Sequence, residues 1–139
     1  QAWLGRAKVF SALKRYDEAF AAYDTAAALD PTLADVWLGR GNLCWTLNRF
    51  DEALAAYLEA LTLRSDLAEA FVGRGNVFSA LGRHDEAFAA YDRAFVLKPN
   101  IVGLEGSRLH AKMFICDWIH HAEERAHLIA SSKSGMPNA

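Results

Sequence analysis

The 139-residue chain has room for one folded domain, and 53% of its residues are hydrophobic and 23% charged, as in ordinary globular proteins. Its net charge of −2 argues against a nucleic-acid partner, and it contains no apolar run of the ~20 residues needed for a membrane span. There is no signal-peptide pattern at the start. Cys44 and Cys116 lie far apart in helical patterns, so we expect two free, buried thiols in a reducing cytoplasm, with a disulfide as the alternative.

A nine-residue pattern occurs three times, and each copy follows the previous one by 34 residues. The copies are Arg15–Tyr23, Arg49–Tyr57 and Arg83–Tyr91. A fixed period of this length is typical of helical hairpins that stack side by side. The period predicts three units, at residues 1–33, 34–67 and 68–100.

Each unit begins with an expected helix that carries a large residue, then Gly or Ala, then another large residue at positions i, i+4 and i+7. These triplets are Trp3, Ala7 and Phe10; Trp37, Gly41 and Cys44; and Phe71, Gly75 and Phe78. The spacing places each triplet on one side of a helix. A small middle residue lets a neighbouring helix approach closely.

A second helix is expected to start near Asp17, Asp51 and Asp85, whose carboxylates are predicted to cap free backbone N–H groups and to favour the positive end of the helix dipole. Each second helix has a stripe of small residues around one tyrosine. The stripes are Ala19, Tyr23 and Ala26; Ala53, Tyr57 and Ala60; and Ala87, Tyr91 and Ala94. Proline ends the first and third units, and Ser65 holds that place in the second.

Residues 101–130 lose the repeat pattern but stay helical in character, and we expect one or two helices there that cap the end of the array. A second amphipathic stretch, from residue 118 to about 130, is expected to be able to fold back on the first. The polar residues 131–139 are predicted to form a flexible tail.

The columns described above resemble the tetratricopeptide repeat, with Ala7, Cys44 and Ser65 as departures and with Arg6, Arg40 and Arg74 where the family often has leucine. The resemblance covers residues 1 to about 100. It implies an all-α fold, a right-handed α-solenoid of three helix-turn-helix repeats followed by C-terminal capping helices.

A shorter resemblance follows the array. The segment Lys112–Trp118, with its Cys-Asp-Trp element, is similar to the junction that precedes the catalytic domain in O-linked N-acetylglucosamine transferases and SPINDLY-type proteins. This resemblance implies that the chain is the substrate-recruiting part of a larger glycosyltransferase, whose catalytic domain is not within these 139 residues.

The concave side of such an array is lined by the first helix of each pair, and the stripe beside the packed triplets is the candidate lining. We predict that a protein or peptide partner binds there. The predicted binding residues are Leu4, Lys8, Leu38, Asn42, Trp45, Val72, Asn76 and Ser79. The amides of Asn42 and Asn76, one period apart, offer both a donor and an acceptor to a peptide backbone, and Lys8 adds a positive charge. The alternative is a solvated surface without specific contacts.

The resemblance limits the kind of partner. Peptide-carboxylate clamps of this family use Lys, Asn and Arg, and Lys8, Asn42 and Asn76 resemble part of such a set. Val72 and Ser79 stand where further charge would be needed, which argues against a chaperone-tail clamp. The transferase's asparagine ladder falls on a column of glycines here, Gly5, Gly39 and Gly73.

Other single residues have competing interpretations. Trp45 is either an exposed binding anchor or a packing residue against the neighbouring repeat. Arg6, Arg40 and Arg74 are expected to cover apolar surface and to pair with Asp24, Glu59 or Asp92. Cys116 and His120, with Asp117 or His121, supply too few converging ligands at i, i+4 for us to expect a metal site. His84 replaces an aromatic residue and is expected to pack.

No Gly-rich phosphate loop or nucleophile elbow is present, so we predict no enzyme activity and no cofactor for this chain. The sequence favours a protein-interaction scaffold that binds an extended peptide or a partner helix in its concave groove. The alternative is self-association into a homo-oligomer through the C-terminal helices or the ends of the array.

Overall fold

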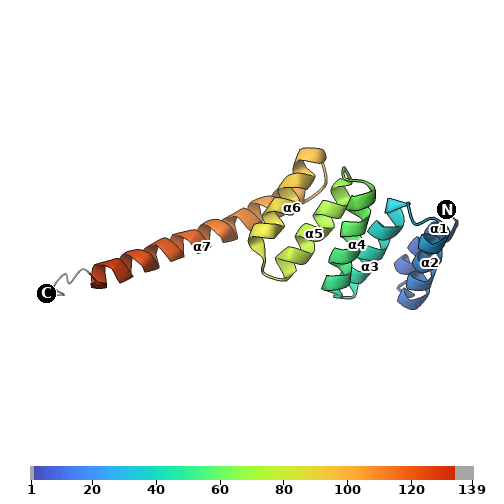
Figure 1. Ribbon diagram of the computed structural model, residues 1–139, viewed down its shortest axis with the longest axis horizontal. Helices are drawn as coiled ribbons and strands as arrows, with labels where there is room; N and C mark the ends of the chain where they lie inside the picture. Colours follow the sequence, from blue (N-terminus) through green and yellow to red (C-terminus); the bar gives the residue numbers. More distant parts are fainter. Residues whose placement is uncertain (1, 134–139) are drawn as a thin grey trace.

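The computed structural model describes residues 2–133, with side chains as far as residue 130, and those residues form seven α-helices. The helices are α1 (Ala2–Ala12), α2 (Tyr16–Leu29), α3 (Ala34–Thr46), α4 (Phe50–Leu63), α5 (Ala68–Ala80), α6 (His84–Leu97) and α7 (Leu104–Lys133). Three helical hairpins, α1–α2, α3–α4 and α5–α6, stand side by side in chain order, and α7 packs on the last of them (Figure 1). The predicted all-helical solenoid is confirmed.

Each hairpin turns in the same way, because the chain enters the left-handed backbone region once, two residues after the first helix. Lys14, Asn48 and Gly82 have φ values of 60°, 58° and 74°. The following residue, an arginine in all three turns, donates its N–H to the carbonyl five residues earlier, as in a Schellman motif; for Arg49 and Cys44 the distance is 2.8 Å. Glycine meets this demand without strain, so Gly82 fits its turn better than Lys14 does.

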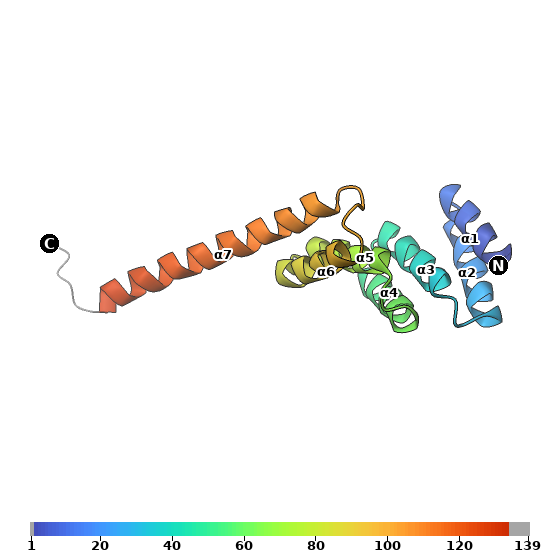
Figure 2. The same ribbon diagram turned by 90° about the horizontal axis from the view of Figure 1, so that it is seen from above.

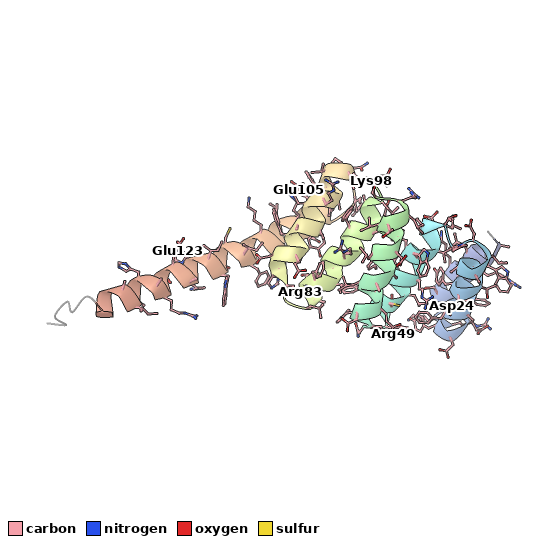
Figure 3. The ribbon with its side chains drawn as sticks, in the orientation of Figure 1. Asp24, Arg49, Arg83, Lys98, Glu105 and Glu123 are labelled. Atoms are coloured by element: carbon pink, nitrogen blue, oxygen red, sulfur yellow. The ribbon has the colours of Figure 1, made fainter. Side chains whose placement is uncertain are left out.

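The predicted caps at Asp17, Asp51 and Asp85 are wrong. The second helices begin one residue before these aspartates, which therefore lie inside the first turn, and the N-cap residues are Arg15, Arg49 and Arg83, which make no side-chain cap hydrogen bond. Each arginine instead forms a two-bond ion pair with the glutamate three residues later, as Arg49 does with Glu52 at 2.8 and 2.6 Å. Arg49 and Arg83 lie along the same edge of the array (Figure 3). Half-exposed pairs of this kind stabilise a helix by only about 0.3–0.5 kcal/mol.

The core consists of three clusters along the array, built mainly from the predicted stripes. The tyrosines at its centre are buried, with exposed fractions of 3% for Tyr23, 1% for Tyr57 and 4% for Tyr91. Each ring packs where a first helix has no side chain. A Cβ atom added to Gly73 would lie 2.3 Å from the ring of Tyr57, and one added to Gly41 would lie 2.7 Å from the same ring. Tyr57 therefore holds its own hairpin to the next one.

The C-terminal segment differs from the prediction. Residues 118–130 do not fold back, because α7 is a single helix that runs into the segment predicted as a flexible tail; residues 134–139 lie outside the described part. Leu104 and Ala111 are buried against α6, but every residue from Cys116 to Ala130 is exposed. In both views this half of α7 extends away from the array (Figures 1 and 2). Of the expected buried thiols, Cys44 is buried and Cys116 is exposed. In the described part of the chain no helix combines the length and apolarity needed to cross a membrane.

The contact between Tyr57 and Gly73 gives a direct test of the packing. We expect Gly73→Ala to lower the free energy of unfolding by about 1–3 kcal/mol, because the new methyl group overlaps a buried ring. Gly5→Ala is the matched control: it is the same substitution in the same repeat column, with nothing within 4 Å of the added Cβ. It should leave stability unchanged or raise it by up to about 1 kcal/mol. Urea denaturation followed by circular dichroism measures both, and equal effects would contradict this account.

Candidate functional site

An open hollow of about 420 Å³ lies between the first helices of the first two hairpins. Three predicted site residues, Lys8, Leu38 and Asn42, meet in it. The remaining lining residues are Ser11, Ala12, Tyr23, Asp35 and Gly39. The hollow thus combines one cation, one carboxylate, polar groups and a half-buried leucine, which suits a mixed peptide segment better than a purely apolar ligand.

The floor of the hollow depends on a missing side chain. A Cβ atom on Gly39 would lie 2.5 Å from the phenol oxygen of Tyr23, so only glycine lets this hydroxyl group pass across α3. Burial raises the pKa of the Tyr23 phenol, which therefore stays a neutral donor well above neutral pH. In the glycine column, Gly39 thus makes room for the hydroxyl group of Tyr23, and Gly73 makes room for the ring of Tyr57.

Hydrogen bonds fix the two predicted asparagines. The Tyr57 hydroxyl donates to Oδ1 of Asn42 at 2.8 Å, and the Tyr91 hydroxyl donates to Oδ1 of Asn76 at 2.8 Å. Each amide carbonyl is therefore engaged from within the array, and the amide NH₂ group is left to donate outward. The sequence predicts that these amides offer both a donor and an acceptor; the buried tyrosine next to each one occupies one of the two lone pairs of the carbonyl oxygen, and the NH₂ donors are not used by it.

Lys8 replaces the asparagine in the first repeat. It stands one period before Asn42, is exposed, and lines the same hollow as Tyr23. Within the described residues the Tyr23 hydroxyl has no hydrogen-bond partner, since a lysine cannot accept its proton. The row Lys8, Asn42 and Asn76 is thus a line of donors along α1, α3 and α5, with its positive charge at the N-terminal end.

The other predicted residues are less available to a partner. Leu4 is only 8% exposed and belongs to the N-terminal core cluster. Trp45 is half-buried, packs on the central cluster and lies 5.6 Å from Phe50 between ring centroids, which supports its packing interpretation. Val72 packs against the third cluster, and Ser79 is half-buried.

Sequence reasoning missed Asp35 and Tyr23 as lining residues. Asp35 stands three residues before Leu38 and seven before Asn42, so helical spacing alone could have placed it on the lining stripe. Tyr23 was assigned to the buried stripe, which is correct for its ring. That its hydroxyl reaches the hollow follows from Gly39 on a neighbouring helix, and no local pattern reports this.

The remaining candidates belong to the framework. The guanidinium of Arg40 pairs with Asp24, and Arg108 pairs with Asp92 at 2.8 Å, so the predicted pairing holds for Arg40. His84 stacks on Phe114 with ring centroids 4.2 Å apart, as expected for a packing residue. Among the described residues, the one group with metal-ligand spacing is His120, His121 and Glu124, all exposed on α7; it does not include Cys116.

Comparison with known proteins identifies the repeat. A family model described as TPR repeat matches residues 7–48 and 41–82, and one described as tetratricopeptide repeat matches residues 68–101. The structure of the first TPR of Spaghetti (RPAP3) bound to the HSP90 peptide SRMEEVD has a TM-score of 0.79 at 22% identity, covering 83% of this chain and 91% of that one. The Arabidopsis OM64 TPR domain has a TM-score of 0.77 at 20% identity, covering 81% and 93%. Among curated proteins, none matches the sequence significantly.

A third solved structure is similar over a slightly shorter part of the chain. The second TPR domain of human RPAP3, in complex with the HSP70 peptide SGPTIEEVD, has a TM-score of 0.72 at 22% identity, covering 78% of this chain and 90% of that one. At these identities the likeness to solved structures establishes the fold.

The buried tyrosines predict how stability depends on alkaline pH. Burial raises the pKa of the Tyr57 phenol above the value of 10 for a free tyrosine, so the folded state holds this proton more tightly than the unfolded state. The stabilisation is present below pH ~10 and is lost as pH rises further, by about 1.4 kcal/mol per pH unit. We expect Tyr57→Phe to lose about 1 kcal/mol at pH 7 with the hydrogen bond to Asn42. Its stability should then fall less steeply than wild type between about pH 10 and 11.5; parallel curves in urea titrations would refute the assignment.

Proposed function

This chain belongs to the tetratricopeptide repeat family, and on that premise we propose that it is an interaction scaffold whose groove binds an extended segment of a partner protein. The observation that carries the proposal is the donor row Lys8, Asn42 and Asn76. Its two amides are held by buried tyrosine hydroxyl groups, so their NH₂ groups are oriented before a ligand arrives. Groups fixed in advance lose little conformational freedom on binding.

The row suits the backbone of an extended peptide. Amide NH₂ groups donate to carbonyl oxygens whatever side chains the peptide carries, so this part of the site is tolerant of sequence. Selectivity would come from Lys8, which favours a carboxylate, and from Leu38, which offers apolar contact in the same hollow. The related structures bound to HSP90 and HSP70 peptides support peptide binding in general. The single lysine of this row favours a less acidic ligand than a tail rich in carboxylates.

The proposed function extends to the larger protein in which this array would act. We propose that the array recruits substrates for a larger O-linked N-acetylglucosamine transferase-like protein, and the support is the Cys116-Asp117-Trp118 element directly after the array. The free, exposed thiol of Cys116 suits a reducing compartment such as the cytoplasm. Sequencing the gene beyond the codon for Ala139 tests this: a reading frame that continues into a glycosyltransferase domain supports it, and a frame without such a domain refutes it.

Self-association is a second candidate, favoured by the exposed half of α7. Apolar residues recur there at alternating spacings of four and three, which is the spacing of helix-pairing seams. The stripe, here called the α7 seam, is Ile115, Ile119, Ala122, Ala126 and Ile129. Ile119 is 50% exposed, and Ile115 and the 69%-exposed Trp118 line a mainly apolar hollow between α7 and the start of α6. A second copy packing its α7 seam against this one would remove that surface from water.

We expect peptides selected from a random phage-displayed library by the wild-type protein to bind Asn42→Asp and Asn76→Asp variants at least tenfold more weakly. The aspartate keeps the oxygen that accepts the tyrosine proton but replaces the outward NH₂ donor with a carboxylate. Asn100→Asp, an exposed asparagine between α6 and α7, is the matched control for charge. Unchanged affinity in both groove variants would place the binding site elsewhere.

For self-association, we expect the wild-type chain to sediment as a dimer at rising concentration and the double variant Ile119→Glu with Ala126→Glu to stay monomeric. Two glutamates that become buried without partners would destabilise the pairing of two α7 seams. Both positions are exposed in the single chain, so the fold should be unaffected, which circular dichroism checks. A wild-type protein that is monomeric up to hundreds of micromolar would exclude this candidate.

A further inference from the structure

Ion pairs between successive hairpins follow the repeat, except at one place. Arg40 on α3 pairs with Asp24, sixteen residues earlier on α2, and Arg108 on α7 pairs with Asp92, again sixteen residues earlier, on α6. The corresponding arginine on α5 is Arg74, and the residue sixteen positions before it is Leu58. Leu58 is 55% exposed and carries no charge. The repeat therefore supplies the arginine but omits its carboxylate.

A second arginine stands beside Arg74. Both line an open hollow of about 360 Å³ between α5 and α6, together with Phe71, Phe78, Glu86, Ala89 and Ala90. The second arginine, Arg93, occupies a repeat position that holds Thr25 and Glu59 in the first two hairpins. The residues three and four positions away from it on α6 are Ala89, Ala90, Val96 and Leu97, so its own helix offers no carboxylate.

The charges in this hollow do not balance. Its one carboxylate, Glu86, already forms a two-bond ion pair with Arg83, with both distances 2.7 Å. Within the described residues neither Arg74 nor Arg93 has an ion-pair partner among the side chains. The Arg74 guanidinium lies 5.5 Å from the centroid of the Phe78 ring, which holds it over apolar surface. Two arginines without ion-pair partners among the described side chains thus line one hollow in a protein whose net charge is negative.

This hollow is not part of the groove. Two residues along an α-helix turn it by about 200°, so Arg74 and the groove residue Asn76 point to opposite sides of α5. The two hollows have no lining residue in common. A ligand can therefore occupy one without displacing a ligand from the other.

We propose that Arg74 and Arg93 form a second docking site, which binds a partner segment carrying a carboxylate next to an apolar side chain. The carboxylate takes the place of the aspartate that the repeat omits at Leu58, and guanidinium groups bind carboxylates through paired, charge-assisted hydrogen bonds. The apolar neighbour packs on the exposed surface of Leu58 and on the half-buried ring of Phe71. This site goes beyond the groove function proposed above and does not depend on it.

The test uses the full chain and the probe acetyl–Leu–Glu–Glu–Leu–amide, with its glutamine twin as the uncharged control. Two-dimensional ¹H–¹⁵N spectra that include the arginine Nε–H signals follow the titration. We expect saturable shifts at Arg74 and Arg93 and an affinity at least fivefold weaker for the twin. Equal shifts with the twin, or the same shifts at lower concentration with inorganic phosphate, would overturn a site for acidic peptides.

Three variants locate the site. Arg93→Glu, which restores the charge found at Glu59, should weaken probe binding at least fivefold. Leu58→Asp should also weaken probe binding at least fivefold, although neither arginine is substituted. The new carboxylate should form an ion pair with Arg74, as Asp24 does with Arg40. Lys8→Glu should leave probe binding unchanged, and a loss there with none in the other two would assign the probe to the groove and overturn the proposal. All three positions are exposed, so the variants should fold.

Discussion

The array depends on one contact, the packing of a tyrosine ring from each second helix against first helices that lack a side chain at that point. Tyr57 lies between Gly41 of its own hairpin and Gly73 of the next, and it is almost completely buried. Because one ring touches both hairpins, the same residue closes a repeat and joins it to its neighbour. The contact also orients the ring so that its hydroxyl group reaches Asn42 on the groove side. Stability and site geometry therefore come from one side chain.

This coupling explains why the polar side chains of the candidate site stand in the column of Lys8, Asn42 and Asn76. A side chain at the Gly39 or Gly73 position would project toward a ligand, but it would collide with Tyr23 or Tyr57. Here the glycines give that space to the tyrosines, and the polar lining moves to the next column, Lys8, Asn42 and Asn76. Asn42 is held by Tyr57, the ring that Gly73 admits, and Asn76 is held by Tyr91. The packing of these glycines against the tyrosine rings thus determines which residues are left to line the groove.

The sequence predicts the fold well because its period is long-range information. Three copies of one pattern give the helical hairpins, their order and the buried stripes, including Ala19, Tyr23 and Ala26. What it does not give depends on contacts between helices. The Asn42 carbonyl is engaged by a tyrosine fifteen residues away, which no local spacing reports. The prediction that Asp51 caps the second helix was wrong because, after the Schellman turn at Asn48, the helix begins at Phe50, one residue before Asp51. Residues 116–130 continue α7 as one helix, and no other helix in the described chain covers them, whereas their amphipathic pattern suggests a second helix that folds back.

Departures from the repeat are therefore where function is to be sought. Columns that hold the hairpins together tolerate little change, since the tyrosine occurs in all three units and its small neighbours vary only between glycine and alanine. Columns with a side chain at the surface are freer, and there the three units differ in charge: lysine against asparagine in the groove, and aspartate against leucine across the joint that Arg74 faces. A substitution at a framework position would lower stability in whichever repeat carries it. A changed residue at these exposed positions alters only what one repeat presents to another molecule, so three nearly identical hairpins can carry two chemically different surfaces.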